Sequence, residues 1–196
     1  MLRTVDLFQQ KPGIIKKAEE KLTALNLALQ NLISNGKTFC PENADRTKGQ
    51  IARGENHKGF PYLSLDMPQL LNKKEFFTFR TLFWWGHYLG FSLILKGGDF
   101  KEYQTQLQQN RQVPGANEDI FFSVSETPWV WEIDSTAHQR LVEIQDEKII
   151  QHCDQAGFIK LLKVYPMSRP EFSSLDWTAI GLETYQAMIT LISKPV

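Results

Sequence analysis

The residues best suited to chemistry are histidines and arginines in the first half of the chain. Arg53 and His57 lie in a polar stretch, and Arg80 and His87 lie in the aromatic stretch that follows it. A histidine exchanges protons near neutral pH, and an arginine binds a carboxylate or phosphate in bidentate geometry. This set would suit an enzyme for a small anionic substrate, with His57 or His87 as the acid/base and Arg53 or Arg80 as the anchor.

The aromatic stretch, residues 76–96, combines core-forming side chains with potentially chemical ones. Asn72 is suited to cap a helix over residues 73–85. On such a helix Trp84 and Trp85 would lie about 100° apart, so that one faces the core and the other lies near the rim. We therefore expect one of the two indoles to line a binding site.

Arg80 would share a face of this helix with Trp84, and its charge would then need an acceptor. Asp66 or Glu132 could pair with the guanidinium, or a tryptophan ring could stack on it. The same guanidinium could instead bind the anionic group of a ligand, with Asp66 beside it. Both roles stay open.

Sequence motifs for phosphates, dinucleotides and metals are missing. Gly54 and Gly59 have the spacing of a phosphate-binding loop, but Phe60 and Pro61 follow where a lysine and a hydroxyl residue are required. The four histidines, at 57, 87, 138 and 152, do not form a metal-binding pattern with each other or with the two cysteines. We predict no cofactor and no metal.

Composition restricts the partners and the compartment. The chain has 196 residues, and 22 basic residues balance 22 acidic ones. A net charge of +0 argues against nucleic acid or a membrane surface as the main partner. Residues 82–95 form the longest apolar run, which is too short and too interrupted to span a bilayer. With two cysteines and no signal-peptide pattern, the chain is expected to be a single cytoplasmic domain, residues 1–196.

Residues 14–34 predict an amphipathic helix. Its apolar positions alternate at three and four residues: Ile15, Ala18, Leu22, Leu25, Leu29 and Leu32. One interpretation is a helix that packs on its own domain. The alternative is a structural homodimer held together by this helix.

The remaining segments predict an α+β fold. A long polar loop is expected at 37–59, and strands are expected at 60–66, 87–96, 119–125, 129–133 and 158–165. Helices are expected at 99–109 and 146–156, with Ile149, Ile150 and Cys153 inward and His152 outside, and from Ser173 or Ser174 to about 193. The strands alternate in polarity and their connections are short, which favours a mixed or mostly antiparallel sheet with helices mainly on one face.

The alternation also predicts a polar face of this sheet. It would carry Tyr62, Ser64, Asp66, Gly90, Ser92, Ser123 and Ser125. Tryptophans such as Trp131 could wall a groove over this floor, and the loop at 37–59 could cover it. The leading hypothesis is a binding module without catalysis, whose ligand is a small molecule or a protein. The enzyme for a small anionic substrate and the homodimer are the alternatives.

Four short pieces of the central region share a pattern with known sequences. They are Pro61-Tyr62, Leu65-Asp66-x-Pro68, Phe79-Arg80-Thr81-x-Phe83-Trp84-Trp85-Gly86 and Ser92-x-x-Leu95-x-Gly97. In these pieces the chain resembles a family of bacterial proteins without a characterised function. The resemblance implies no reaction, no cofactor and no catalytic residue.

Overall fold

A computed structural model of the chain describes residues 4–36, 38–113 and 118–194. This part contains four α-helices, a short 3-10 helix at Pro170–Ser174 and a seven-stranded sheet with the order β1-β2-β3-β4-β7-β5-β6. Each pair of neighbouring strands is antiparallel. The helices are α1 (Thr4–Ser34), α2 (Phe100–Asn110), α3 (Asp146–Ala156) and α4 (Trp177–Ile192). The strands are β1 (Gln50–His57), β2 (Phe60–Leu71), β3 (Phe76–Trp84), β4 (Tyr88–Lys96), β5 (Phe121–Ser123), β6 (His138–Arg140) and β7 (Ile159–Pro166).

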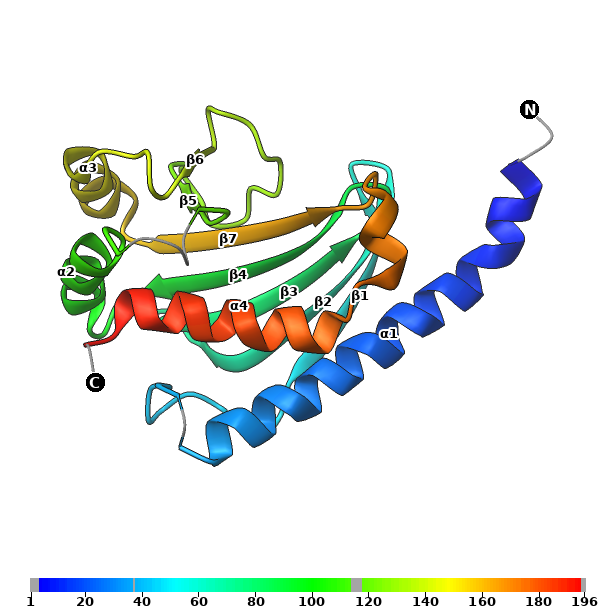
Figure 1. Cartoon of the computed structure of the whole chain (residues 1–196), viewed down its shortest axis with the longest axis horizontal. Helices are drawn as coiled ribbons and strands as arrows, with labels where there is room; N and C mark the ends of the chain where they lie inside the picture. The colour runs from blue at the N-terminus through cyan, green and yellow to red at the C-terminus, as the bar shows by residue number, and fades with distance from the viewer. Residues whose placement is uncertain (1–3, 37, 114–117, 195–196) are drawn as a thin grey trace.

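Helices α1 and α4 lie side by side on one face of the sheet, and α2 and α3 lie at one end of it (Figure 1). The main core lies between α1, α4 and this face. The arrangement confirms the predicted α+β class, with an antiparallel sheet and helices mainly on one face. None of the described helices has the length and apolar character needed to cross a membrane.

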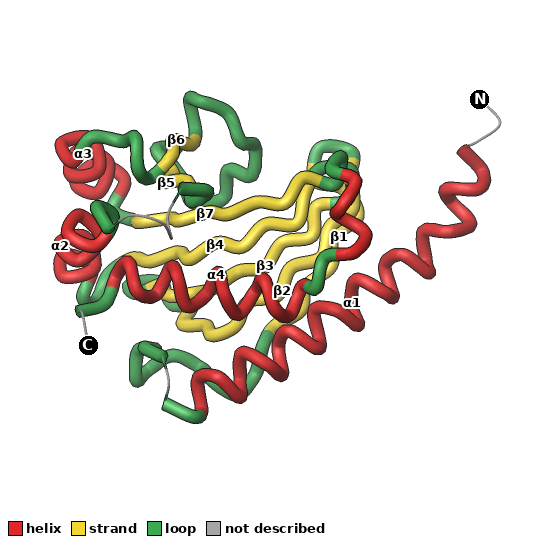
Figure 2. Tube along the Cα trace, viewed as in Figure 1, coloured by secondary structure: helices red, strands yellow, loops and turns green. Residues whose placement is uncertain are grey.

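Helix α1 is longer than predicted, because it begins at Thr4 and continues through Pro12. A proline removes one backbone hydrogen bond from a helix, but here it does not end the helix. The apolar seam packs inside the chain: Leu22, Leu25 and Leu29 are fully buried in the main core. The apolar seam that suggested a homodimer is therefore buried against the sheet and α4 of the same chain. The homodimer stays a prediction. The N-terminal part of α1 extends beyond the sheet (Figure 2).

The predicted helix over residues 73–85 is wrong, because this segment forms β3. Its alternate residues Phe77, Phe79 and Phe83 are buried in the core under the helices. Bulky aromatic side chains favour a pleated surface, and here this period of two outweighs the helical interpretation. The Asn72 carboxamide accepts hydrogen bonds from the backbone N–H groups of Lys74 and Glu75 at 2.9 and 2.7 Å, so it stabilises the turn between β2 and β3.

The predicted loop at 37–59 is wrong for residues 50–57, which form the edge strand β1. Lys37 lies outside the described residues. β1 pairs with β2, with Arg53 opposite Leu63. Its charged side chains hide the strand signal, but such charges are typical of an edge strand, where they discourage pairing with another chain.

The second half of the chain differs from the prediction in short elements. Strand β5 has three residues, β6 was not predicted, and residues 129–133 form no regular strand. Helix α3 has the predicted bounds, but two of its side chains face the opposite way from the prediction. Ile150 is 40% exposed, whereas His152 is buried between the rings of Phe122 and Phe158. An imidazole can fill an apolar site when it is neutral, and hydrophobic periodicity does not reveal this.

Helix α4 begins after Asp176 instead of Ser173 or Ser174. The Asp176 carboxylate accepts hydrogen bonds from the backbone N–H groups of Thr178 and Ala179 at 3.0 and 3.1 Å. An aspartate at this position satisfies N–H groups that have no partner within the helix. The two serines fall instead in the preceding 3-10 helix.

Candidate functional site

The sheet face opposite α1 and α4 carries a buried set of polar side chains. Strand register places Asp66 beside Arg80 and Arg80 beside Ser92. Farther along the sheet, β6 places His138 beside Ser123. We call this set the polar belt; it comprises Asp66, Thr78, Arg80, Ser92, Ser123, His138 and Lys160. Buried polar groups are costly unless they are paired, so this concentration needs an explanation.

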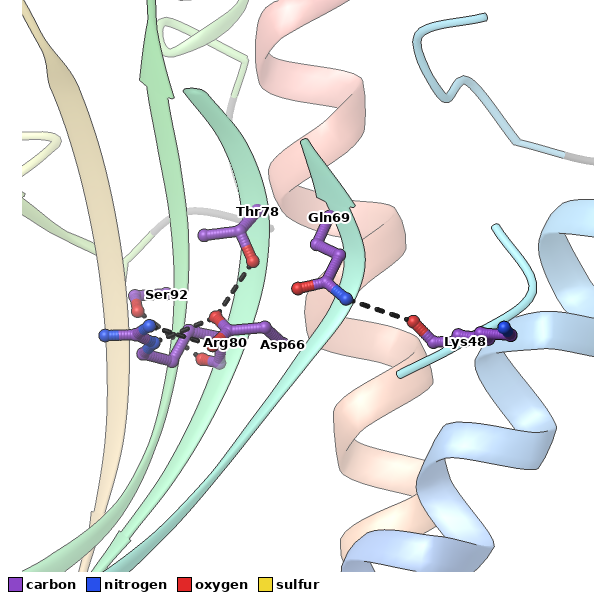
Figure 3. A network of polar contacts seen from close by, with 6 residues as sticks. All are labelled: Lys48, Asp66, Gln69, Thr78, Arg80 and Ser92. Atoms are coloured by element: carbon purple, nitrogen blue, oxygen red, sulfur yellow. Dashed lines mark hydrogen bonds and ion pairs between the residues drawn. The ribbon is translucent and has the colours of Figure 1, made fainter. Parts of the chain in front are cut away.

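Asp66 and Arg80 form the strongest contact of the polar belt (Figure 3). Arg80 donates from Nε to Asp66 Oδ1 at 2.9 Å and from Nη2 to Asp66 Oδ2 at 2.8 Å. Thr78 Oγ1 also donates to Asp66 Oδ1, and the guanidinium lies 4.8 Å from the centre of the Trp129 ring. The expected structural role of Arg80 is thus present, with Asp66 as its partner and a tryptophan stacked on it.

The polar belt is covered by residues 126–134, which we call the strap. Tyr88 donates its hydroxyl proton to the Trp131 carbonyl at 2.6 Å, and Lys160 Nζ donates to the Val130 carbonyl at 2.7 Å. These side chains satisfy carbonyl groups that the strap, which is not a strand, leaves without a strand partner. The space that remains between the strap and the sheet is only about 10 Å³. The predicted groove is therefore closed, and its cover is the strap instead of residues 37–59.

An aromatic cluster lies at the end of the same face and includes Trp84, Tyr88, Tyr62 and Trp131. The His87 ring stacks on Trp84, with ring centres 3.7 Å apart. His57 packs against Trp131 at 3.8 Å and meets Trp84 edge-on at 5.1 Å. Trp84 and Trp131, both predicted binding residues, are therefore parts of a packed cluster.

The two candidate catalytic histidines lie in this cluster. The Nε2 atoms of His57 and His87 are buried and have no hydrogen-bond partner among the described residues. Burial lowers the pKa of His57, although the Glu132 carboxylate acts in the opposite direction. The surroundings of His57 therefore suit a neutral imidazole that packs on tryptophan.

The predicted arginine anchors lie in separate surroundings. Arg53 is half exposed and pairs with Glu55 at 2.8 Å, whereas Arg80 pairs with Asp66. In the part of the chain that the structure describes, no hydrogen bond or ion pair joins a histidine to an arginine. Nor do three or more His, Cys, Asp or Glu side chains gather there as a metal site. The geometry of an acid/base beside an anion anchor is not assembled from these residues.

An open hollow lies at Trp85, the remaining predicted binding residue. It has a volume of about 350 Å³ and is lined by Lys11, Glu55, Gly59, Phe60, Pro61, Trp85 and Gly86. The backbone N–H of Trp85 donates to the Pro61 carbonyl at 3.1 Å, and this hydrogen bond holds the β3–β4 turn against the start of β2. Gly86 has φ +87°, and a Cβ there would lie 2.9 Å from the Phe60 ring. Glycine at this position therefore lets Phe60 lie against the turn.

The rim of this hollow carries charge. Glu55 accepts a hydrogen bond from Lys11 Nζ at 2.6 Å and another from Arg53 Nε at 2.8 Å. These contacts, Lys11 first, lower the pKa of the Glu55 carboxyl. Two cationic side chains thus share one carboxylate, which leaves one positive charge in excess. The structure brings Arg53 and Trp85 to the same end of the sheet, away from Arg80.

Lys160 and His138 were missed by the sequence reasoning. Both are only 3% exposed. Burial, and then the charge of Arg80, lowers the pKa of Lys160 to about 8. Burial, and then the charge of Lys160, lowers the pKa of His138 to about 4. A signal for Lys160 existed, since it alternates with Ile159 and Leu161 in an apolar strand; His138 lies in a strand too short to show a pattern.

Comparison with known proteins adds no relative. No family model, no curated protein and no solved structure matches this chain. The resemblance carried by the Phe79–Gly86 segment stays a prediction. Function must therefore be argued from the site itself.

Proposed function

We propose that this protein is a binding module without catalysis whose site is the hollow at Trp85. Its ligand is a small molecule that combines an apolar ring or chain with one anionic group. The observation that carries this proposal is an open, mainly apolar hollow of about 350 Å³ beside an excess of positive charge. This volume falls in the range of small-molecule sites, roughly 300–1,000 Å³.

The apolar lining supports an apolar part of the ligand. Phe60 is 41% exposed, although it is a large aromatic residue, and Trp85 beside it is half-buried. Removing apolar surface from water contributes roughly 25 cal/mol per Å², and aromatic rings provide much of it with few rotatable bonds. A ring or chain laid against Phe60 and Trp85 would gain most from this effect.

The rim supports an anionic group on the ligand. Lys11 and Arg53 both contact the Glu55 carboxylate, so a second carboxylate would find a cation that is only partly neutralised. All three side chains are partly exposed, so solvent screening keeps the contribution of each ion pair small. The positive charge would therefore favour anionic ligands over neutral ones, but it would contribute little to the binding free energy.

The composition of the hollow supports binding over turnover. Of its seven lining residues, Lys11 and Glu55 are the ionisable ones, and they are bound to each other. His57 and His87 lie in the aromatic cluster, and Lys160 lies under the strap. A general acid or base needs to reach the ligand within hydrogen-bond distance. The lining supplies no free group of this kind among the described residues.

The test is a thermal-unfolding screen with phenylacetate, indole-3-acetate and hexanoate, each compared with its neutral amide. A ligand that binds the native state raises the unfolding midpoint. We expect at least one carboxylate to raise the midpoint more than its amide does. Isothermal titration then measures the dissociation constant of that compound.

Two variant pairs locate the site. Phe60→Ala should weaken binding about tenfold, which corresponds to about 1.4 kcal/mol, whereas Ile51→Ala, another exposed apolar truncation on β1–β2, should not. Lys11→Met should weaken the carboxylate and leave the amide unchanged, whereas Lys16→Met on the same helix should change neither. The proposal fails if no compound raises the midpoint, or if Phe60→Ala binds as tightly as Ile51→Ala.

A further inference from the structure

Lys160 is a buried cation without a carboxylate partner in the part of the chain that the structure describes. Among the described residues its Nζ makes one hydrogen bond, which it donates to the Val130 carbonyl at 2.7 Å. An ammonium has further N–H donors, and burial makes each unpaired donor costly. Lysine is almost never fully buried unless it is paired.

The nearby charges do not neutralise Lys160. Both oxygens of Asp66 are bound by Arg80. Glu132 pairs with Lys58 at the edge of the aromatic cluster, and although its charge acts on Lys160, it is not within ion-pair distance of it. A histidine is neutral or cationic, so the buried His138, whose pKa is lowered in part by the charge of Lys160, does not compensate this charge either. The polar belt therefore retains one uncompensated positive charge.

A small void lies where this charge is. The void of about 10 Å³ between the strap and the sheet is lined by three side chains that carry donors, Lys160, Arg80 and Ser92, and otherwise mainly by apolar and aromatic residues of the sheet and the strap. A space of this size holds about one water molecule. Ser92 Oγ makes a long hydrogen bond of 3.4 Å to the Arg80 carbonyl, so its hydroxyl proton can turn to another acceptor at little cost.

We propose that this void binds one small monovalent anion of the halide class, held by Lys160, Arg80 and Ser92. The anion would neutralise the excess charge, accept the remaining Lys160 donors and fill the void beneath the strap. Charge-assisted hydrogen bonds are strong in a site from which water is excluded. The pKa of Lys160, lowered by burial to about 8, still leaves the amine mostly protonated at pH 7, so the charge persists under ordinary conditions.

The first experiment measures thermal unfolding at pH 7 in sodium chloride and in sodium gluconate at equal ionic strength. Gluconate is a monovalent anion too large for the void. When chloride is about a hundredfold above its dissociation constant, we expect a midpoint roughly 5–10 °C above that in gluconate. Lys163→Met, a lysine removed from the opposite face of the same strand, should keep this difference. Lys160→Met should abolish it.

Equal midpoints in chloride and gluconate would overturn the proposal, and so would a Lys160→Met protein that keeps the full difference. If Lys160→Met does not fold, wild-type crystals grown in sodium bromide decide the question. An anomalous bromide peak within hydrogen-bond distance of Lys160 Nζ supports the anion site. A water molecule there without an anomalous signal shows that the void is only a solvent site.

Discussion

Replacing His138 with glutamine should make this protein less sensitive to acid. His138 is buried in β6 and is only 3% exposed. Burial, with the charge of Lys160 in support, lowers its pKa from 6.5 to about 4. A neutral imidazole fits this environment, whereas an imidazolium would place a second positive charge beside Lys160.

The size of the effect follows from the difference between the folded and unfolded pKa values. At pH between 6.5 and 4 the unfolded chain binds the His138 proton and the folded chain does not. The free energy of unfolding therefore falls as the pH falls through this window, and it is unaffected by His138 above it. Each pKa unit corresponds to about 1.4 kcal/mol, so the full loss is about 3 kcal/mol, and roughly 2.5 kcal/mol of it should be present at pH 4.5.

The assay is urea unfolding of the wild type and of His138→Gln between pH 7.5 and 4.5. Glutamine is polar, similar in size and does not titrate in this range. The difference in unfolding free energy between the two proteins should move in favour of the variant by roughly 2.5 kcal/mol over this interval. Gln139→Ala, a change at the neighbouring position of β6, should shift stability equally at every pH.

One result would refute this reasoning. If the difference between wild type and His138→Gln stays constant from pH 7.5 to 4.5, His138 does not carry a lowered pKa in the folded protein. His152 is also buried with a lowered pKa, so the wild type loses stability in acid for more than one reason. The decisive quantity is therefore the difference in unfolding free energy between the wild type and His138→Gln at each pH, and not the wild-type curve alone.

Two further predictions concern stability. Asp66→Asn should cost about 2–4 kcal/mol in urea unfolding, because it leaves the largely buried Arg80 guanidinium without its counter-ion; the Asp66→Leu/Arg80→Leu double variant should lose much less than the sum of the Asp66→Leu and Arg80→Leu single variants, and additive losses would contradict the pairing. Gly97→Ala should cost at least about 1–2 kcal/mol, because Gly97 has φ +69° and a Cβ would lie 2.1 Å from the Lys74 carbonyl oxygen. Gly13→Ala, which meets no atom within 4 Å on helix α1, should instead stabilise by about 0.5–1 kcal/mol, and equal effects at the two glycines would show that the clash is absent.

The prediction was accurate where one strong pattern dominated a segment. Helix α3 was found with its correct bounds, and the alternation in β4 placed Leu89, Phe91 and Leu93 on the core face. It was wrong where two patterns overlapped. Residues 76–84 carry aromatics that satisfy helical spacing and strand alternation together, and the strand forms because β2 and β4 pair on both sides of it.

The candidate site was partly predictable for the same reason. Asp66, Arg80 and the tryptophans are candidates that the sequence offers, but the surroundings that the structure gives them differ from the expected ones. The polar belt is covered by the strap, which is held by side chains of the sheet and has no strand partner. Such a segment has no hydrophobic periodicity from which its position could be predicted. One of Trp84 and Trp85 was expected near a rim on a helix, and it is Trp85 that lines the hollow, from the turn that follows β3.

By itself, the sequence determined the class of the protein and which side chains share a sheet face. Composition sets the size of the core, and the period of two along a strand places Ser64 and Asp66 on one side by local geometry alone. Only the tertiary structure decided that Lys160 and His138 lie together beneath a tryptophan strap. That neighbourhood depends on β7 pairing with both β4 and β5, which are far apart along the chain, and local propensity carries no information about such pairing.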